Sequence, residues 1–324
     1  SGFFCKTRED GRFYAVAGHN HASVVEVTGF EKFKRLGGGL SVTQKDVDAA
    51  MEWDRKVQSR KLYEAAKVIE CRRRKGGITV DGDPAEWDFK SATLDGRDAS
   101  LAMTYDDANL FVCFTVNGSG PLQNRGNDWH RLFKTGAAVD LQIGVDPKAD
   151  AQRKAPAAGD CRLLLTMTGE GPTAVLYQPS APGAKPDEGW EARTGVARSG
   201  FDRVVKLPQV RMAARGDGKG YCAEALIPLE SLGLAIVPDG AYKFDWGILM
   251  GGPEGNTVLE RVYWANPQTA ILADEAIESQ LHPDLWGTVR FSASAGRKGQ
   301  PGLDLDKPLG TEIEDDVTLD LEDE

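Results

Sequence analysis

The sequence lacks the signals that identify most enzymes and membrane proteins. No apolar run approaches the roughly 20 residues that a membrane-spanning helix requires. The nucleophile elbow GxSxG, the zinc motif HExxH, the Walker A loop and a GxGxxG turn between strand and helix do not occur. Only four histidines are present, and they are scattered along the chain. These absences lead us to expect no membrane span and no enzymatic activity.

A basic face is also missing. The chain carries a formal net charge of −10, but residues 301–324 hold ten acids and one lysine, so the tail alone accounts for −9. The rest of the chain is nearly neutral. Nucleic acids and anionic membranes bind basic surfaces, so we expect neither as a partner.

Cysteine is scarce and has no metal-binding spacing. The five cysteines form neither CxxC pairs nor the Cys/His patterns of zinc sites. Three of them, Cys113, Cys161 and Cys222, lie in apolar, strand-like runs, which predicts small buried thiols. The sequence leaves their disulfide state open, and an odd number leaves at least one thiol unpaired in a monomer.

The hydrophobic pattern divides the chain into four parts. Residues 1–42 contain short β-rich runs, such as GRFYAVAG and ASVVEVTG, separated by Gly, Asn and His. Residues 43–77 place apolar residues at helical spacing behind an N-cap threonine, which predicts one long connecting helix. Residues 78–292 form the main domain. Residues 293–324 form an acidic, flexible tail that is too polar to bury a core.

The main domain consists of short strand-like runs with almost no helix. Alternating strands flank an Asp-Asp-Ala-Asn turn in SLAMTYDDANLFVCFTVN, which predicts a β-hairpin. Similar runs recur to the end of the domain, and one brief helical turn is expected at PLESLGL. Many short strands without a βαβ pattern predict a mainly β protein built on an antiparallel β-sandwich.

A polar strand face in the middle of this domain is the first candidate for a binding site. In AAVDLQIGV, apolar residues alternate with Asp140 and Gln142, so an acid and an amide lie behind a packed face. Trp129 precedes this strand in a loop rich in Gly, Asn and Asp, and Arg162 begins the next strand. An aromatic ring, an acid, an amide and an arginine can together hold a polyhydroxylated ligand.

A second tryptophan adds to this set. In VLERVYWAN, Trp264 lies on the same side of the predicted strand as Glu260 and Asn266. Indole rings stack on the C–H faces of sugars, and amides bind sugar hydroxyls. Ordinary core packing is the alternative for Trp264, and loop-to-sheet packing is the alternative for Trp129.

Acidic residues offer two further hypotheses. Asp140 and Glu260 are the carboxylates to test for glycoside hydrolysis, although no motif supports that role. Four aspartates in predicted turns have oxygen ligands suited to a structural calcium ion, which is a possible cofactor. Turn aspartates more often bind their own backbone. They are Asp81, Asp83, Asp106 and Asp107.

Five segments of the main domain resemble, in order, the β-sandwich of carbohydrate-binding module family 9. They are ITVDGDPAEW, TYDDANLFVCFTVN, GAAVDLQIGVDP, the PLESLGL turn after AEALIP, and LWGTVRF, within about residues 78–291. Sugar-binding members clamp a terminal sugar between two tryptophans while acid, amide and arginine side chains reach its hydroxyls. The ligand-binding residues that the resemblance implies are Trp129, Asp140, Gln142, Arg162, Trp264 and Asn266.

The resemblance implies a non-catalytic, carbohydrate-binding-like module of a larger secreted or cell-envelope protein. YAVAGHNHASVVEV, residues 14–27, resembles the last blade of the β-propellers found in large secreted bacterial proteins. The expected partner is therefore a glycan or another domain of a larger protein.

Two other functions share this sandwich. Haem-b-binding domains of the ethylbenzene dehydrogenase γ-subunit type use an axial methionine, a role that Met103 or Met250 would fill. A purely structural, protein-interaction sandwich would bind neighbouring domains and no sugar.

Overall fold

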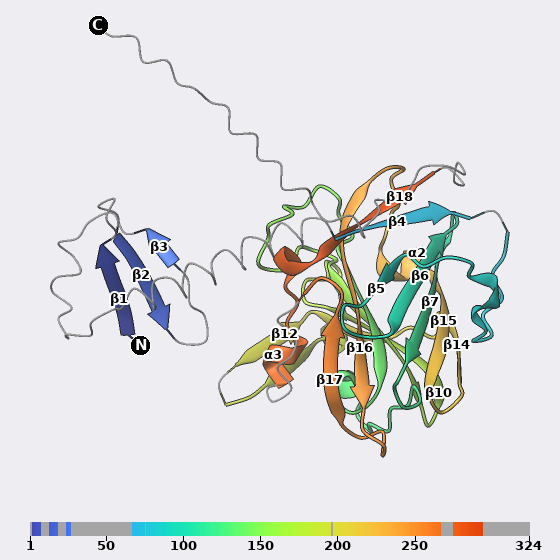
Figure 1. The fold of residues 1–324 in the computed structure, drawn as a ribbon. Coiled ribbons are helices and arrows are strands. Elements are labelled where there is room, and N and C mark those ends of the chain that lie inside the picture. The colour runs from blue at the N-terminus through green and yellow to red at the C-terminus, as the bar shows by residue number, and fades with distance from the viewer. Residues whose placement is uncertain are drawn as a thin grey trace, which may run out of the picture.

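The N-terminal strands form a small sheet of their own in the computed structural model (Figure 1). β1 (Gly2–Thr7), β2 (Phe13–Gly18) and β3 (Val24–Glu26) pair in antiparallel fashion in the order β1-β2-β3. β2 and β3 fall within the runs predicted as strands. The structure describes these three strands by their backbone alone, and it describes side chains for residues 67–74, 76–195, 197–266 and 275–293.

Strand β4 (Val68–Arg73) corrects part of the predicted helix over residues 43–77. Ile69 and Cys71 are fully buried, whereas Glu70 between them is exposed, which is the alternation of a strand with one packed side. β4 pairs in parallel with two strands from later parts of the chain, and this pairing overrides the helical tendency of the sequence before it. The main domain therefore begins with β4, before the predicted boundary. The rest of the predicted helix up to residue 66, the β-rich run FKRLGGGLSV (residues 33–42) and the acidic tail from residue 294 lie outside the described residues.

The main domain contains one sheet of thirteen strands. Besides β4, its strands are β5 (Ala92–Thr93), β6 (Ala99–Tyr105), β7 (Asn109–Asn117), β8 (Ala138–Ile143), β9 (Cys161–Thr168), β10 (Gly171–Gln178), β13 (Arg203–Lys206), β14 (Arg211–Gly216), β15 (Gly220–Pro228), β16 (Ala241–Gly251), β17 (Val258–Tyr263) and β18 (Gly287–Ser292). A separate hairpin joins β11 (Trp190–Arg193) to β12 (Arg198–Phe201).

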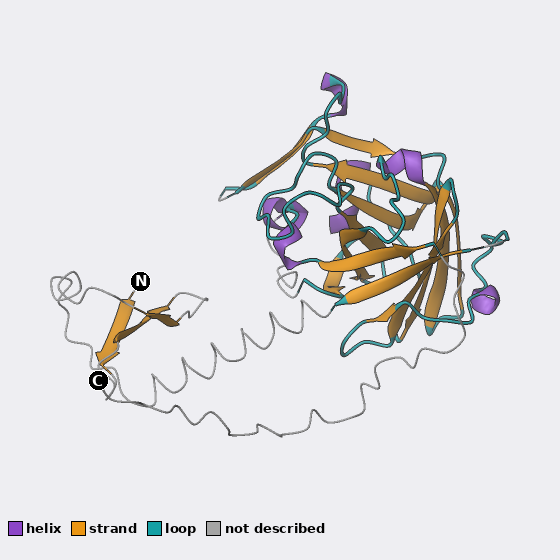
Figure 2. Cartoon of the chain, turned by 90° about the horizontal axis from the view of Figure 1, so that it is seen from above, coloured by secondary structure: helices purple, strands orange, loops and turns teal. Residues whose placement is uncertain are grey.

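This sheet curls into two layers around one core. Its strand order is β13-β10-β9-β8-β16-β18-β4-β6-β7-β15-β14, with β17 beside β16 and β5 beside β6. The edge strand β14 contacts β10, so the two ends of the sheet approach each other, and Figure 2 shows the curl from above. In the core, the ring centres of Phe114 on β7 and Trp246 on β16 lie 6.0 Å apart. The predicted mainly β sandwich is confirmed. β4 departs from the predicted antiparallel arrangement, because it pairs in parallel with β18 and β6.

The predicted hairpin over β6 and β7 is confirmed. The Asp106 carboxylate accepts hydrogen bonds from the backbone N–H groups of Ala108 (2.8 Å) and Asn109 (2.7 Å), and the Asp106 N–H donates to the Asn109 carbonyl (2.9 Å). These bonds replace the sheet ladder within the turn, which explains why the Asp-Asp-Ala-Asn sequence reverses the chain here.

Among the described residues, helices are few and short. They are η2 (Pro84–Glu86), η3 (Trp129–Lys134), η4 (Pro186–Glu188), α2 (Leu229–Leu232), α3 (Glu275–Ser279) and η6 (Pro283–Leu285). α2 is the helical turn expected at PLESLGL, and it ends at Gly233, whose φ of 65° favours glycine. No helix among the described residues is long and apolar enough to cross a membrane.

Candidate functional site

A buried ion pair occupies the polar side of β8. Arg162 on β9 donates to Asp140 on β8 through two bonds, Nε to Oδ1 at 3.1 Å and Nη2 to Oδ2 at 2.6 Å. The Tyr263 hydroxyl, at the end of β17, donates to the same carboxylate. Asp140 is fully buried, and Arg162 is 1% exposed. The two opposite charges are stable in this interior because two hydrogen bonds join the guanidinium to the carboxylate.

Aromatic rings enclose this ion pair. The Arg162 guanidinium carbon lies 5.1 Å from the ring centre of Phe133 on η3 and 5.7 Å from that of Tyr177 on β10. Burial opposes the charge on Arg162, yet the Asp140 carboxylate holds its pKa above the ordinary value. Burial raises the pKa of Tyr263 to about 12, so its hydroxyl remains a donor at neutral pH. Arg162 is therefore held charged inside a cation–π cage.

The predicted ligand face of β8 is covered by protein. Asp140, Gln142 and Arg162 are brought together as expected, since Gln142 pairs with Arg162 in the β8–β9 register. However, every residue of β8 is buried, because η3 and the aromatic residues of neighbouring strands pack on this side. Gln142 is 4% exposed, and its side-chain oxygen has no hydrogen-bond partner among the described residues. The expectation that these three side chains face a solvent-open site is corrected: they form the support beneath η3.

Trp264 and Asn266 lie inside the protein at the end of β17. Trp264 is 8% exposed within the main core, and Lys67 Nζ lies 5.4 Å from its ring centre. Asn266 is 3% exposed, and its N–H donates to Asp245 at 2.9 Å. Burial raises the pKa of Asp245 to about 7, against the lowering effect of the backbone N–H groups that it accepts. The structure favours core packing for Trp264.

Trp129 opens η3 and is only partly buried. The carboxylate of Asp128, the N-cap, accepts from the His130 backbone N–H at 3.0 Å, which fixes the start of η3. The Trp129 indole stacks on the His130 ring, with centroids 3.6 Å apart and planes 26° apart, and His130 in turn lies 6.0 Å from Trp190. Trp129 and Trp264 belong to separate apolar clusters, so the described contacts do not bring the two predicted clamp rings together.

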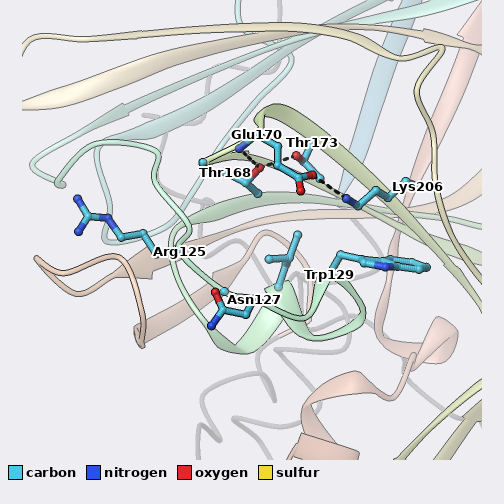
Figure 3. Close-up of a pocket in the computed structure, with 10 residues that line it drawn as sticks. Arg125, Asn127, Trp129, Thr168, Glu170, Thr173 and Lys206 are labelled. Carbon is cyan, nitrogen blue, oxygen red and sulfur yellow. Dashed lines mark hydrogen bonds and ion pairs between the residues drawn. The ribbon is translucent and has the colours of Figure 1, made fainter.

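A pocket of about 430 Å³ lies beside Trp129. It is bounded by the loop before η3, the turn between β9 and β10, and the end of β13. Figure 3 shows the Trp129 ring across the pocket from Glu170 and Lys206, whose carboxylate and ammonium lie 3.0 Å apart. Its polar lining comes from Arg125, Asn127, Thr168, Glu170, Thr173 and Lys206.

The short helix α3 braces η3 from outside. Arg131 Nε donates to Glu275 at 3.0 Å, and Lys134 donates to Glu278. The Glu278 side chain is fully buried, and Arg261 on β17 donates to its backbone carbonyl at 3.0 Å. Arg131 and Lys134 therefore fix η3 to α3, and Arg261 fixes α3 to β17, although α3 lies far from η3 in the sequence.

Other predicted chemistry is dispersed over the domain. Glu260 forms a surface ion pair with Arg97, whereas Asp140 is buried, so the two carboxylates proposed for hydrolysis have separate partners. Met103 is 1% exposed within the core, and Met250 is partly buried against it. Within the described ranges, no group of three or more His, Cys, Asp or Glu side chains is placed to hold a metal ion.

The turn aspartates have protein partners. Asp81 and Asp83 accept from Arg215 at 3.2 and 3.4 Å, and Asp83 also accepts from the Ala85 backbone N–H at 3.0 Å. Asp106 closes its own hairpin, and Asp107 pairs with Arg73. A structural calcium ion stays a prediction.

No family model and no curated protein matches the sequence. Among solved structures, a family 9 carbohydrate-binding module from Caldicellulosiruptor kristjanssonii, in complex with cellotriose, shares 14% identity with a TM-score of 0.44. A glucose complex of a family 9 module from the same organism shares 12% identity with a TM-score of 0.40, and each match covers 72% of this chain and 100% of the other. This chain is similar to a family 9 carbohydrate-binding module. The candidate site is defined by the positions of its residues in this structure.

Several residues of the pocket are not among those predicted from the sequence. Arg125 and Asn127 stand beside Trp129 in RGNDW, and this adjacency was the available signal. Glu170 lies in the tight β9–β10 turn, and Lys206 reaches the pocket because β13 pairs with β10. The sequence pattern does not predict that β13 pairs with β10.

Proposed function

We propose that this domain is a non-catalytic module that binds a sugar unit in the pocket beside Trp129. The indole of Trp129 is stacked on His130, and Trp129 is one of the residues that line the pocket. A half-buried indole held rigid in this way offers the apolar face on which a pyranose ring stacks, with little loss of side-chain entropy on binding. This is the observation that carries the proposal.

The polar lining supports a hydroxyl-rich ligand. Asn127 and Thr173 can both donate and accept hydrogen bonds, Glu170 accepts, and Lys206 donates. The volume of about 430 Å³ lies within the range of roughly 300–1,000 Å³ that is typical of small-molecule pockets. A sugar between Trp129 and the Glu170–Lys206 pair would meet an apolar surface on one side and polar groups on the other.

The same lining argues for binding without hydrolysis. Glycoside hydrolysis ordinarily needs two carboxyl groups flanking the scissile bond. Glu170 is the one carboxylate that lines the pocket among the described residues, and Lys206 forms an ion pair with it.

We propose that the domain is part of a larger extracellular or cell-envelope protein. Glycans are plentiful in that location, and the module would attach the larger protein to them. The alternative partner is another domain of that protein. In that case the sandwich would bind protein and leave saccharides untouched.

Isothermal titration with mono- and oligosaccharides of glucose and xylose tests the binding proposal. We expect a dissociation constant in the millimolar range or below. Trp129→Ala should weaken binding by about tenfold or more, because a stacked ring contributes on the order of 1.4 kcal/mol. Phe89→Ala is the matched control, since Phe89 is 39% exposed and packs on Trp87 rather than on the pocket. Absence of binding, or equal affinity in the Trp129 variant and wild type, would overturn the proposal.

A further inference from the structure

Two cysteines meet in an apolar cluster separate from the one that contains η3. Cys113 on β7 and Cys222 on β15 have their sulfur atoms 3.4 Å apart. In the β7–β15 register, Cys222 pairs with Thr115 and Cys113 pairs with Glu224, so the two cysteines are diagonal neighbours on one face of the sheet. The sulfur–sulfur bond of a disulfide is about 2.05 Å, so the thiols need to close by only about 1.4 Å.

The chain segment before β5 packs over this pair. Trp87 lies in the same apolar cluster as both cysteines, and its indole N–H donates to Glu224 at 2.6 Å. Glu224 also accepts from the backbone N–H groups of Asp81 (2.9 Å) and Gly82 (2.7 Å). This cover shields Cys113, which is 2% exposed.

Cys222 remains within reach of solvent. It is 8% exposed and lines a pocket of about 360 Å³, together with Thr115, Arg215 and Tyr221. Among the other described cysteines, Cys71 and Cys161 are fully buried on β4 and β9. Of these two buried cysteines, Cys222 is therefore the more exposed and the one that borders a pocket, and Cys113 lies enclosed beside it.

We propose that Cys113 and Cys222 form an oxidisable dithiol that a low-molecular-weight disulfide, such as glutathione disulfide, converts into a cross-link between β7 and β15. The Cys222 thiolate attacks the oxidant through the pocket, forms a mixed disulfide and releases one glutathione thiolate. Cys113 sulfur then attacks Cys222 sulfur, the bond to glutathione breaks, and the second glutathione leaves as a thiol with the Cys113 proton. Two protein thiols are oxidised, and one glutathione disulfide is reduced to two glutathiones.

The two thiols are suited to different steps. The hydrogen bond to Cys222 and burial raise the pKa of Cys113 well above the ordinary value, so Cys113 stays protonated until a mixed disulfide forms beside it. Attack from the pocket side by Cys222 is therefore the first step.

The test uses the reduced protein, incubated with glutathione disulfide at pH 8. In the Cys5→Ser variant, which leaves the four cysteines of the main domain, the number of thiols titrated after unfolding should fall from four to two, with no glutathione mass retained. Non-reducing peptide mapping should join the Cys113 and Cys222 peptides, and the melting temperature should rise by several degrees until dithiothreitol reverses it. Cys113→Ala should instead retain one glutathione on Cys222. Four unreacted thiols in the Cys5→Ser variant, a stable glutathione adduct on Cys222 while Cys113 is present, or a cross-link between other cysteines would overturn the proposal.

Discussion

Paired charges are buried on the outer side of β8, where a single substitution should have a large effect. Arg162→Ala would leave the Asp140 carboxylate without its two guanidinium bonds inside a fully buried site. Breaking one partner of a buried ion pair costs about 3–5 kcal/mol, so we expect a loss of that size in the free energy of unfolding. Urea denaturation followed by tryptophan fluorescence measures it.

The matched control for that loss is a surface arginine. Arg97 pairs with Glu260, but its side chain is 42% exposed, so Arg97→Ala should cost less than about 1 kcal/mol. Similar losses for the Arg162 and Arg97 variants would contradict the role we assign to the buried pair.

Asp245 should make the stability of the domain depend on pH. Burial raises its pKa from 3.8 to about 7, so folding favours the protonated carboxyl. Its contribution to stability is then fully present below pH 3.8 and is lost as the pH rises through about 7. The Asp245→Asn variant lacks this titration, so the difference in melting temperature between wild type and variant should change between pH 4 and pH 8. A constant difference over that range would contradict the assignment.

At the scale of elements, β4 sets the boundary of the folded domain. Ile69 and Cys71 are fully buried, and β4 bridges β18 and β6. A fragment that begins at residue 67 should give a cooperative thermal transition, whereas one that begins at residue 78 loses this strand and the apolar area it buries. Equal melting temperatures for the two fragments, measured by circular dichroism, would show that β4 is dispensable.

Local pattern was sufficient for most strands and insufficient for β4. The β6–β7 hairpin and α2 follow from alternation and turn residues that lie next to each other in the sequence. Val68–Arg73 is a short run after a stretch rich in Ala, Lys and Glu, and periodicity over six residues distinguishes poorly between helix and strand. Its parallel partner β18 lies at the far end of the described chain, so tertiary pairing decides its conformation.

The candidate site was also predictable only in part, because local pattern places residues on strands but does not show which distant segments pack over them. Residue type and alternation correctly placed Asp140 beside Gln142 and Arg162, and Trp129 outside the strand. Sequence alone did not show that η3, held by α3, would cover that face, because Glu275 and Glu278 are far from Arg131 and Lys134 in the chain. Because η3 covers this face, we expect ligand contacts in the pocket beside Trp129 rather than on β8.

For the whole molecule, the curled sheet explains why the pocket lies where it does. β13 is the edge strand beside β10, and the β9–β10 turn and the loop before η3 end at the same place. The Glu170–Lys206 pair therefore faces Trp129 across a gap that no single element creates (Figure 3).

A crystal structure of the protein with its tightest-binding saccharide would test that arrangement most directly. The account predicts a sugar ring stacked on Trp129, with hydroxyl groups within hydrogen-bonding distance of Glu170, Lys206 or Asn127. A sugar bound at Trp264, or anywhere that leaves Trp129 without contact, would contradict it.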